Sequence, residues 1–257
     1  MAKIGVDLTG KTALVTGGGS GFGQAFARVL RANGARVCVT GRRLNKLEQT
    51  LAAIPGADAT NSLAVVMDVT DPASVAAGFD ACESRLGLAD IVVSNAGISR
   101  VGHAHELPEE DWLAVIDTNL NAAYRVSAEG GRRLIAAGKP GCVVNISSIL
   151  ALVVQNGLIA YAAAKAGLVQ VTKTMAVEWA RYGIRVNALA PGYVETEMNR
   201  DYFATEAGKA FIKKVPQRKL GAPEDLDGPL LLLVSDAGAY MTGSVLVVDG
   251  GLSLAGP

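Results

Sequence analysis

The chain has 257 residues, of which 50% are hydrophobic, so it can bury the core of one large domain or two small ones. Its 24 lysines and arginines balance 24 aspartates and glutamates, which argues against nucleic-acid and anionic-membrane partners, because both bind an excess of positive charge. The longest apolar runs span about seven residues, whereas a membrane-spanning helix needs roughly 18.

The chain alternates short β-branched runs with longer helical patterns. After the first strand, Phe22, Phe26 and Leu30 recur at helical spacing, and after the third strand Asp71-Pro72 predicts an N-cap followed by the first helical residue. The predicted strands lie at 12–16, 36–40, 64–67, 91–93, 142–146, 184–189 and 245–248.

The later helices follow the same rhythm. Pro108 and the acidic residues after it open a long helix, and a second helix from about Ile159 carries an apolar stripe that includes Leu168 and Met175. Apolar strands separated by helices indicate a parallel sheet covered on both faces. We therefore predict one Rossmann-type, doubly wound α/β domain over residues 1–257, with about seven strands and a flexible substrate flap at about 194–215.

A glycine-rich turn links the first predicted strand to the first helix. It reads Thr16-Gly17-Gly18-Gly19-Ser20-Gly21-Phe22-Gly23. Glycine allows the backbone to approach a pyrophosphate, and the helix that follows directs its free N–H groups and positive end at that group. In a strand–turn–helix of this kind a nucleotide site is favoured over a plain tight turn, although the spacing is not the common G-x-G-x-x-G.

The end of the second predicted strand bears on the choice between NAD and NADP. Proteins that bind NAD usually carry a carboxylate about 20 residues after the glycines, where it binds the ribose 2′-hydroxyl. Here Gly41 leaves room for a 2′-phosphate, and Arg42 and Arg43 can pair with it, so NADP is favoured over NAD. The alternative is that both arginines are solvated at a helix start; Ser20 also stands where many NADP-binding proteins carry a second basic residue.

Tyr161 and Lys165 lie four residues apart in a predicted helix and so share one of its faces. Free tyrosine has a pKa of about 10, and a nearby ammonium together with an oxidised nicotinamide would lower it. Ser147 and Ser148 follow the fifth strand, where a hydroxyl could donate to a substrate carbonyl. A Tyr-x-x-x-Lys pair alone is common on surfaces, and serines often end strands, so the arrangement carries the interpretation.

The chain resembles the short-chain dehydrogenase/reductase family across nearly its whole length. Ser94 in place of a more usual asparagine, and Ser20, are mild departures from the family pattern. The resemblance rests on Thr16-Gly17-x-x-x-Gly21-x-Gly23, Asp68-Val69, Asn95-Ala96-Gly97, Asn119, Ser148, Tyr161-x-x-x-Lys165 and Pro191-Gly192-x-x-x-Thr196.

This resemblance implies a catalytic set and a cofactor site. Tyr161 would be the general acid/base, and Ser148 would orient the carbonyl. Lys165 would bind the nicotinamide ribose and lower the tyrosine pKa, and Asn119 would support a water-mediated proton path to Lys165. The implied cofactor-binding residues are Gly17, Gly19, Ser20, Gly21, Phe22, Gly23, Arg42, Arg43, Asp68, Val69, Asn95, Ala96, Gly97, Tyr161, Lys165, Pro191, Gly192, Val194 and Thr196.

The substrate pocket is expected to be largely apolar, which suggests a ketone or secondary alcohol with hydrophobic groups. A sugar and a 3-oxoacyl thioester are alternative substrates that the sequence leaves open. Besides Ser148 and Tyr161, the predicted lining is Ile149, Val153, Asn156, Tyr193, Met198, Tyr202 and Phe203.

His103, His105 and Glu106 are the set of side chains that most suggests a metal site. Such a site needs three or four convergent ligands, and the chain has two histidines in total. We therefore expect a loop near the substrate entrance and a protein that uses no metal.

Together the motifs predict an NAD(P)-dependent oxidoreductase that moves a hydride between nicotinamide and a ketone or alcohol carbon of a small molecule. One alternative is a fold-related lyase such as a halohydrin dehalogenase, which would be expected to lack the glycine turn and the lysine. Another is a nucleotide-binding protein without turnover, which would tolerate loss of Tyr161, Ser148 or Lys165.

The family also implies a homotetramer in which the helices that start near Pro108 and Ile159 pack across a two-fold axis. The first residues lack the long apolar region of a signal peptide, which suggests a cytoplasmic protein. The odd number of cysteines agrees with this view, and they are interpreted as reduced core thiols: Cys38, Cys82 and Cys142.

Overall fold

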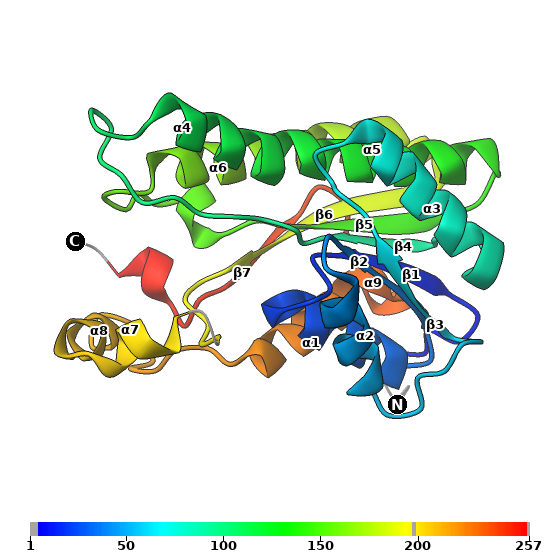
Figure 1. The fold of residues 1–257 in the computed structure, drawn as a ribbon, viewed down its shortest axis with the longest axis horizontal. Helices are drawn as coiled ribbons and strands as arrows, with labels where there is room; N and C mark the ends of the chain where they lie inside the picture. The colour runs from blue at the N-terminus through cyan, green and yellow to red at the C-terminus, as the bar shows by residue number, and fades with distance from the viewer. Residues whose placement is uncertain (1–4, 197–198, 256–257) are drawn as a thin grey trace.

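The computed structural model describes residues 5–196 and 199–255, and its centre is one parallel sheet of seven strands (Figure 1). The strand order β3-β2-β1-β4-β5-β6-β7 reverses between β1 and β4, which is the switch point where doubly wound sheets bind ligands. This arrangement confirms the predicted Rossmann-type fold. The strands are β1 (Thr12–Thr16), β2 (Arg36–Gly41), β3 (Ser62–Val66), β4 (Ile91–Ser94), β5 (Gly141–Ile146), β6 (Ile184–Pro191) and β7 (Val245–Val248).

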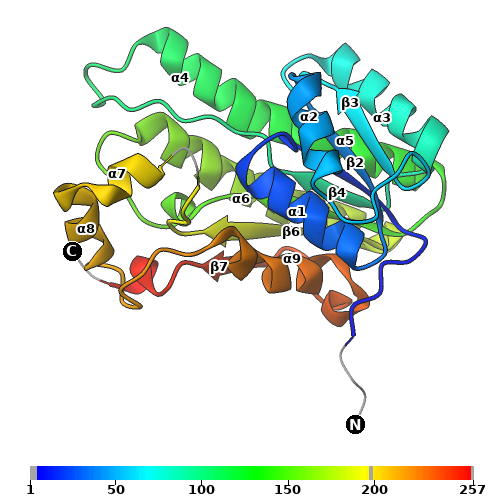
Figure 2. The ribbon, with the colours of Figure 1, turned by 60° about the horizontal axis from the view of Figure 1, so that its bottom comes forward.

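Helices cover both faces of the sheet, as Figures 1 and 2 show. α1, α2 and α9 lie on one face, and α3, α4, α5 and α6 lie on the other. No helix that the structure describes is both long and apolar enough to cross a membrane. The bounds are α1 (Gly21–Ala32), α2 (Leu44–Ala52), α3 (Pro72–Leu86), α4 (Glu109–Ile116), α5 (Ala122–Ala136), α6 (Ile159–Trp179), α7 (Arg200–Ala204), α8 (Glu206–Ile212) and α9 (Asp227–Val234).

The core forms on both faces because side chains along each strand alternate in direction. In β1, Ala13 and Val15 join a buried cluster with α1 and α9, whereas Leu14 joins the cluster formed by α3, α5 and α6. Strands buried on both faces carry unbroken apolar runs, which is why the sequence marks them so clearly. Thr16, the last residue of β1, pairs with Thr40, one residue before the end of β2, so the loops that follow share one edge.

The structure differs from the sequence prediction in several boundaries. The third strand runs over Ser62–Val66 rather than 64–67, and the sixth continues to Pro191. The predicted long helix after Pro108 is interrupted by a π-helical turn, Asp117–Asn121, between α4 and α5. In this turn the Ala122 N–H donates to the Asp117 oxygen five residues earlier, a distortion that side-chain periodicity does not reveal.

The segment predicted as a flap contains the short helices α7 and α8. In both views they lie beyond the same end of the sheet as the loops that lead into α4 and α6 (Figures 1 and 2). At the start of the flap, the side chain of Val194 is buried in the core cluster beneath it. Met198 of the predicted substrate lining lies outside the described residues, and the mobility of the flap stays a prediction.

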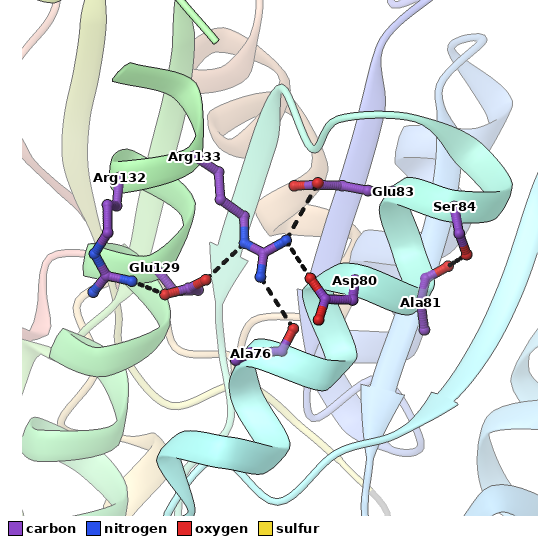
Figure 3. Close-up of polar contacts among 8 residues, drawn as sticks. All are labelled: Ala76, Asp80, Ala81, Glu83, Ser84, Glu129, Arg132 and Arg133. Carbon is purple, nitrogen blue, oxygen red and sulfur yellow. Dashed lines mark hydrogen bonds and ion pairs between the residues drawn. The ribbon is translucent and has the colours of Figure 1, made fainter. Parts of the chain in front are cut away.

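Arg133 joins α5 to α3 through its charged side chain (Figure 3). Its guanidinium lies 2.6 Å from Glu129, 2.8 Å from Asp80 and 3.2 Å from Glu83, and it also donates to the main-chain oxygen of Ala76. Burial opposes the charge of Arg133, but the three carboxylates outweigh it and raise the pKa of the guanidinium. The two helices are therefore fastened at a point remote from the carboxyl edge of the sheet.

Replacing Arg133 with methionine is expected to lower the free energy of unfolding by about 2 to 3 kcal/mol. The reason is that Glu129, whose side chain is 13% exposed, loses the partner that shields its charge. Arg132 is a matched control, because it pairs with the same carboxylate but is 68% exposed, so Arg132→Met should cost less than about 1 kcal/mol. Urea unfolding measures the free energy of unfolding of both variants. Equal losses in the two variants would contradict the claim that burial makes the Arg133 ion pairs more important.

Candidate active site

Contacts between the ends of β1 and β4 shape the glycine turn. The Thr16 hydroxyl accepts hydrogen bonds from the main-chain N–H groups of Asn95 at 2.9 Å and Ala96 at 3.0 Å. The Asn95 side-chain amide donates in return to the Thr16 main-chain oxygen at 2.8 Å. These bonds lock together the two strand ends that flank the switch point, so two motifs far apart in sequence form one local structure.

The turn itself has the geometry of an anion-binding cradle. A Cβ atom on Gly23 would lie 2.2 Å from the Gly17 main-chain oxygen, so only glycine lets α1 approach the turn this closely. Ser20 is the N-cap of α1, yet its side chain caps no N–H group of the described residues, and the first turn contains no acidic residue. The N–H groups and the positive end of the helix around Gly21 and Phe22 are therefore available to an anion.

At the end of β2, Arg42 and Arg43 are exposed, and Arg42 lies near the loop that follows β3. In that loop, the Asp68 carboxylate accepts hydrogen bonds from the N–H group of Thr70 at 2.9 Å and from its hydroxyl at 2.7 Å. These bonds, and to a lesser degree the charge of Arg42, lower the pKa of Asp68. The predicted phosphate and adenine residues thus lie at neighbouring strand ends.

Arg125 of α5, which sequence reasoning missed, holds the same loop in place. Its Nη1 donates to the main-chain oxygen of Val69 at 2.8 Å, and Asp117 lies 3.8 Å from its guanidinium. The arginine side chain is 25% exposed, so much of its length packs inside the protein. A single arginine in a helical pattern gives no signal of such a contact.

Ser148, Tyr161 and Lys165 converge at the carboxyl end of β5. Ser148 begins a short 3-10 turn, in which its hydroxyl oxygen accepts a hydrogen bond from the Leu150 N–H group at 3.1 Å. Tyr161 and Lys165 lie in the first turns of α6, with the ammonium 5.6 Å from the centre of the phenol ring. The Ser148 hydroxyl lies near enough to Tyr161 to lower the pKa of the phenol. The structure therefore brings together three of the four predicted catalytic side chains.

Lys165 is buried, and its ammonium donates to the main-chain oxygen of Ile146 at 2.8 Å. The Ser147 hydroxyl donates to the main-chain oxygen of the lysine at 3.1 Å, which ties α6 to the end of β5. Burial disfavours the charged form and lowers the pKa of Lys165 to about 8. Two of its three protons stay available for other partners.

Asn119, the fourth predicted catalytic residue, lies in the π-helical turn and is completely buried. Its amide oxygen accepts from the Ile98 N–H group at 2.8 Å, and its amide nitrogen donates to the Ile98 oxygen at 2.6 Å. A Cβ atom on Gly97 would lie 2.8 Å from the Asn119 amide oxygen and 3.7 Å from the Lys165 nitrogen. Asn119, Gly97 and Lys165 therefore pack against one another, while the asparagine side chain is engaged with the backbone.

The pKa of Tyr161 departs from the sequence expectation. Burial raises it, a hydrogen bond from Ser148 lowers it, and the neighbouring Tyr193 raises it further. Lys165 does not produce the lowering expected from its ammonium, because that group is directed at Ile146 and loses its own proton more readily than an ordinary lysine. Among the described groups, Ser148 is the one that favours the phenolate.

Replacing Lys165 with methionine is expected to change how stability depends on pH. The pKa of Lys165 is lowered from 10.5 to about 8, so the unfolded chain binds more protons between these values. The wild type should therefore gain stability relative to Lys165→Met as the pH rises through this window, by about 3 kcal/mol in full. Urea unfolding at about pH 7 and about pH 9.5 tests the direction, and a constant difference would show that the pKa is not lowered.

On the substrate side, the loop after Ser148 faces the turn after β6. The Tyr193 hydroxyl donates a hydrogen bond to Gln155, a residue that the sequence reasoning did not single out. Asn156 contacts His103 through its amide oxygen, 3.1 Å from Nδ1. Ile149 is only 2% exposed, so it is part of the core and not of an open pocket wall, which corrects its predicted place in the lining.

The segment after β6 contacts both the sheet edge and α1. A Cβ atom on Gly192, next to Pro191, would lie 2.7 Å from the Asp249 Cα atom, so this turn packs closely on the strand end of β7. The Thr196 N–H group donates to the Asn199 side chain at 2.8 Å. Thr196 also lines a groove of about 850 Å³ opposite α1, together with Gly21, Gln24, Arg28, Arg200, Lys219 and Glu224.

His103 and His105 stack with ring centres 6.1 Å apart, and Glu106 lies 3.4 Å from His105. Among residues 5–196 and 199–255, no three His, Cys, Asp or Glu side chains are arranged to hold a metal ion. Both histidines lie in the loop that leads into α4, beside the Ser148 loop. This position agrees with their interpretation as residues near the substrate entrance.

Comparison with known proteins gives the family of the chain. A family model described as enoyl-(acyl carrier protein) reductase matches residues 17–253. The gluconate 5-dehydrogenase of Gluconobacter oxydans (strain 621H) is 36% identical over 248 residues, which cover 96% of each chain. The 3-oxoacyl-(acyl-carrier-protein) reductase of Escherichia coli (strain K12) is 36% identical over 247 residues, 96% of this chain and 99% of that protein.

Solved structures agree with this result. A gluconate 5-dehydrogenase from Burkholderia cenocepacia J2315, in complex with NADP and tartrate, superimposes with a TM-score of 0.91 at 35% identity, over 98% of each chain. The chain belongs to the short-chain dehydrogenase/reductase family, as the sequence motifs predicted.

Proposed function

We propose that the chain is an NADP-preferring oxidoreductase that interconverts a ketone or aldehyde and an alcohol on a small-molecule substrate, without a metal. The observation that carries this proposal is the convergence of Ser148, Tyr161 and Lys165 at the carboxyl end of β5, beside the glycine turn. The names of the relatives, dehydrogenase and reductase, support the reaction class. They lend no support to a lyase or to a nucleotide-binding protein without turnover.

The geometry of the glycine turn fits a dinucleotide. The uncapped first turn of α1 would hold the pyrophosphate, with Gly17, Gly19 and Gly23 allowing close approach. Asp68 and Val69 would border the adenine. The segment Asn95–Gly97 and the residues after β6 (Pro191, Gly192, Val194 and Thr196) would border the nicotinamide half, with Val194 acting through its main chain because its side chain is buried.

Three features support NADP over NAD. Gly41 leaves open space at the end of β2, since a Cβ atom there would meet only Leu47, at 3.5 Å. Arg42 and Arg43 beside it are exposed and can pair with a 2′-phosphate. The solved gluconate 5-dehydrogenase described above contains NADP.

The proposed chemistry assigns one task to each catalytic side chain. The bound dinucleotide would supply the hydride for reduction or accept it for oxidation. The Ser148 oxygen accepts its hydrogen bond from Leu150, and its proton, which favours the Tyr161 oxygen, would turn to the substrate oxygen when a carbonyl binds. Tyr161 would deliver the proton to that oxygen as the carbonyl is reduced, and oxidation would follow the reverse path.

The proton on Tyr161 would then be replaced from the interior. Lys165, with its pKa lowered to about 8, can exchange protons near neutral pH and lies beside the phenol ring. The Asn119 side chain, which packs beside Lys165, is engaged with Ile98, so a water path to the lysine would have to use another group of the π-helical turn.

Replacing Arg125 with alanine is expected to raise the KM for the dinucleotide about fivefold and leave kcat nearly unchanged. The change removes one hydrogen bond to Val69, worth about 1 kcal/mol, and touches no reacting atom. Arg125→Lys, which keeps a charged donor, should recover part of the affinity. Steady-state kinetics with varied dinucleotide measures the effect, and a fall in kcat with constant KM would contradict this positioning role.

Mixing the purified protein with a ketone panel and either NADPH or NADH tests the proposed function. Loss of absorbance at the nicotinamide band with NADPH, and slower loss with NADH, is the expected result. No turnover with any carbonyl, despite fluorescence evidence of NADPH binding, would favour the nucleotide-binding alternative.

The proposal includes a homotetramer. A groove of about 760 Å³ on the outer face of α5 and α6 supports it, because apolar side chains line a surface that a second copy could cover. Its lining includes Leu120, Tyr124, Ile135, Val171, Met175 and Trp179. Light scattering that gave the mass of a single chain would contradict this part of the proposal.

We place the protein in the cytoplasm as part of the same proposal. The free thiols of Cys38, Cys82 and Cys142 are all buried, which suits a reducing compartment. Localisation of a tagged chain by cell fractionation would test this placement.

A further inference from the structure

Four aromatic rings gather beside the candidate catalytic residues; we call Tyr193, Tyr202, Phe203 and Phe211 the aromatic wall. Tyr193 follows β6, and its ring centre lies 4.6 Å from that of Phe211 and 5.9 Å from that of Phe203, both in edge contacts. Phe203 also contacts Tyr202 at 5.1 Å. The flap helices α7 and α8 therefore contact Tyr193 through the rings of Phe203 and Phe211. Tyr193 in turn lies close enough to Tyr161 to raise the pKa of Tyr161.

Exposed apolar side chains stand on the loop that leads into α4 and on the loop after Ser148. Val101 is 82% exposed and Val154 is 95% exposed, and Leu152 between Ser148 and Val154 is 52% exposed. The two loops are fastened together where the Gly102 N–H group donates to the Gly157 oxygen at 2.9 Å. We call Val101, Leu152 and Val154 the apolar rim.

An exposed apolar rim next to a reactive site suits a ligand that buries it. The rim lies on the loop that begins at Ser148 and on the loop bonded to it, so its position is fixed relative to the reacting oxygen. The aromatic wall is joined to the rim loop where the Tyr193 hydroxyl donates to Gln155, next to Val154, and Tyr202 of the wall is also 54% exposed. Both surfaces present carbon rather than charge.

Several cations near the site are directed elsewhere, among them Arg100, which precedes the rim residue Val101 and lies 3.0 Å from Asp111. Arg200 lies 3.1 Å from Glu195, and with Lys219 it lines the groove toward α1. Lys209 lies 2.8 Å from Glu206. Lys165 contacts the Tyr161 ring, but its ammonium is committed to a main-chain oxygen beneath the site. Arg200, Lys209, Lys219 and Lys165 are therefore not placed to give a substrate carboxylate a charge-assisted partner beside Tyr161.

We infer that the substrate is an uncharged ketone or secondary alcohol with a bulky apolar ring system, held between the aromatic wall and the apolar rim, and not an anionic sugar acid. The inference rests on the proposed function, since the carbonyl must reach Ser148 and Tyr161. A rigid ring packs on flat aromatic faces and covers the rim with little loss of conformational entropy. A long acyl thioester would lose more freedom for the same contact.

Three probes test the substrate class with NADPH: the bicyclic ketone decalone, the anionic ketogluconate, and diacetyl, a small uncharged diketone. The value of kcat/KM for decalone is expected to exceed that for ketogluconate by at least about tenfold. A preference for ketogluconate would overturn the substrate class but leave the proposed function standing. Reduction of none of the three would instead count against the proposed function.

A double variant, Val101→Ser with Val154→Ser, tests the apolar rim directly. The ratio of kcat/KM for decalone to that for diacetyl should fall about tenfold, since hydroxyls replace apolar contacts. Val177→Ser is the matched control, because Val177 is 81% exposed near the far end of α6. An unchanged ratio would overturn the inference. A change in the oligomeric state of the double variant on gel filtration would also overturn the inference, because the rim would then be an interface between copies of the chain.

Discussion

Replacing Tyr161 with phenylalanine is expected to lower kcat for ketone reduction by about a hundredfold or more, the lower range for acid/base catalysis. The variant removes one hydroxyl and leaves the ring, which packs against Val115, Ala160 and Ala164. Fold and dinucleotide site should therefore survive. Titration of NADPH fluorescence should give a Kd within about twofold of the wild type, because the residues that shape the glycine turn are unchanged.

Tyr240→Phe is the matched control, since Tyr240 is fully exposed and far along the chain from α6. Its kcat should equal that of the wild type. If Tyr161→Phe kept its turnover, Tyr161 would not be the proton donor, and the proposed mechanism would be wrong. A loss of NADPH binding in the same variant would indicate a structural fault and call for the readout to be repeated with Ser148→Ala, which leaves the tyrosine in place.

The site could be predicted from the sequence because its residues stand at the ends of elements that the sequence marks clearly. Ser148 follows an apolar strand directly, and in a parallel sheet every such end reaches the same edge. Tyr161 and Lys165 meet because a helix brings residues four apart onto one face. No knowledge of long-range contacts was needed for these placements.

The remainder depends on contacts that no local pattern encodes. The π-helical turn at Asn119 forms because that buried amide bonds to both main-chain groups of Ile98, 21 residues away in sequence. Arg125 reaches Val69 across 56 residues for a similar reason. The raised pKa of Tyr161 follows from burial, and burial is a property of the assembled core rather than of the helix that carries the residue.

The raised pKa of Tyr161 bears on which protonation state of the phenol each direction of the reaction needs. Before the dinucleotide binds, the protein holds Tyr161 as a neutral phenol and Lys165 as an ammonium with a lowered pKa. A neutral phenol is the form that donates a proton to a carbonyl, as the proposed reduction requires. Oxidation requires a phenolate, which the positive charge of an oxidised nicotinamide would favour.

Replacing Gly41 with aspartate is expected to reverse the cofactor preference. The carboxylate would repel a 2′-phosphate and accept a hydrogen bond from the ribose 2′-hydroxyl of NADH. We expect kcat/KM for NADPH to fall about a hundredfold and that for NADH to rise, because placing like charges together costs several kcal/mol. The backbone tolerates the change, since a Cβ atom at position 41 makes only an ordinary contact with Leu47.

Two further variants make this result interpretable. Gly5→Asp adds the same charge at an open position and should leave both cofactor constants unchanged. Arg42→Ala should weaken NADPH alone, by removing a charged partner of the 2′-phosphate without adding repulsion to the site. If Gly41→Asp lowered kcat/KM for NADH and NADPH equally, the end of β2 would not lie at the ribose. The assignment of Arg42 as a partner of the 2′-phosphate would then also be wrong. The ratio of the two kcat/KM values is therefore the decisive measurement, since a general loss of activity cancels from it.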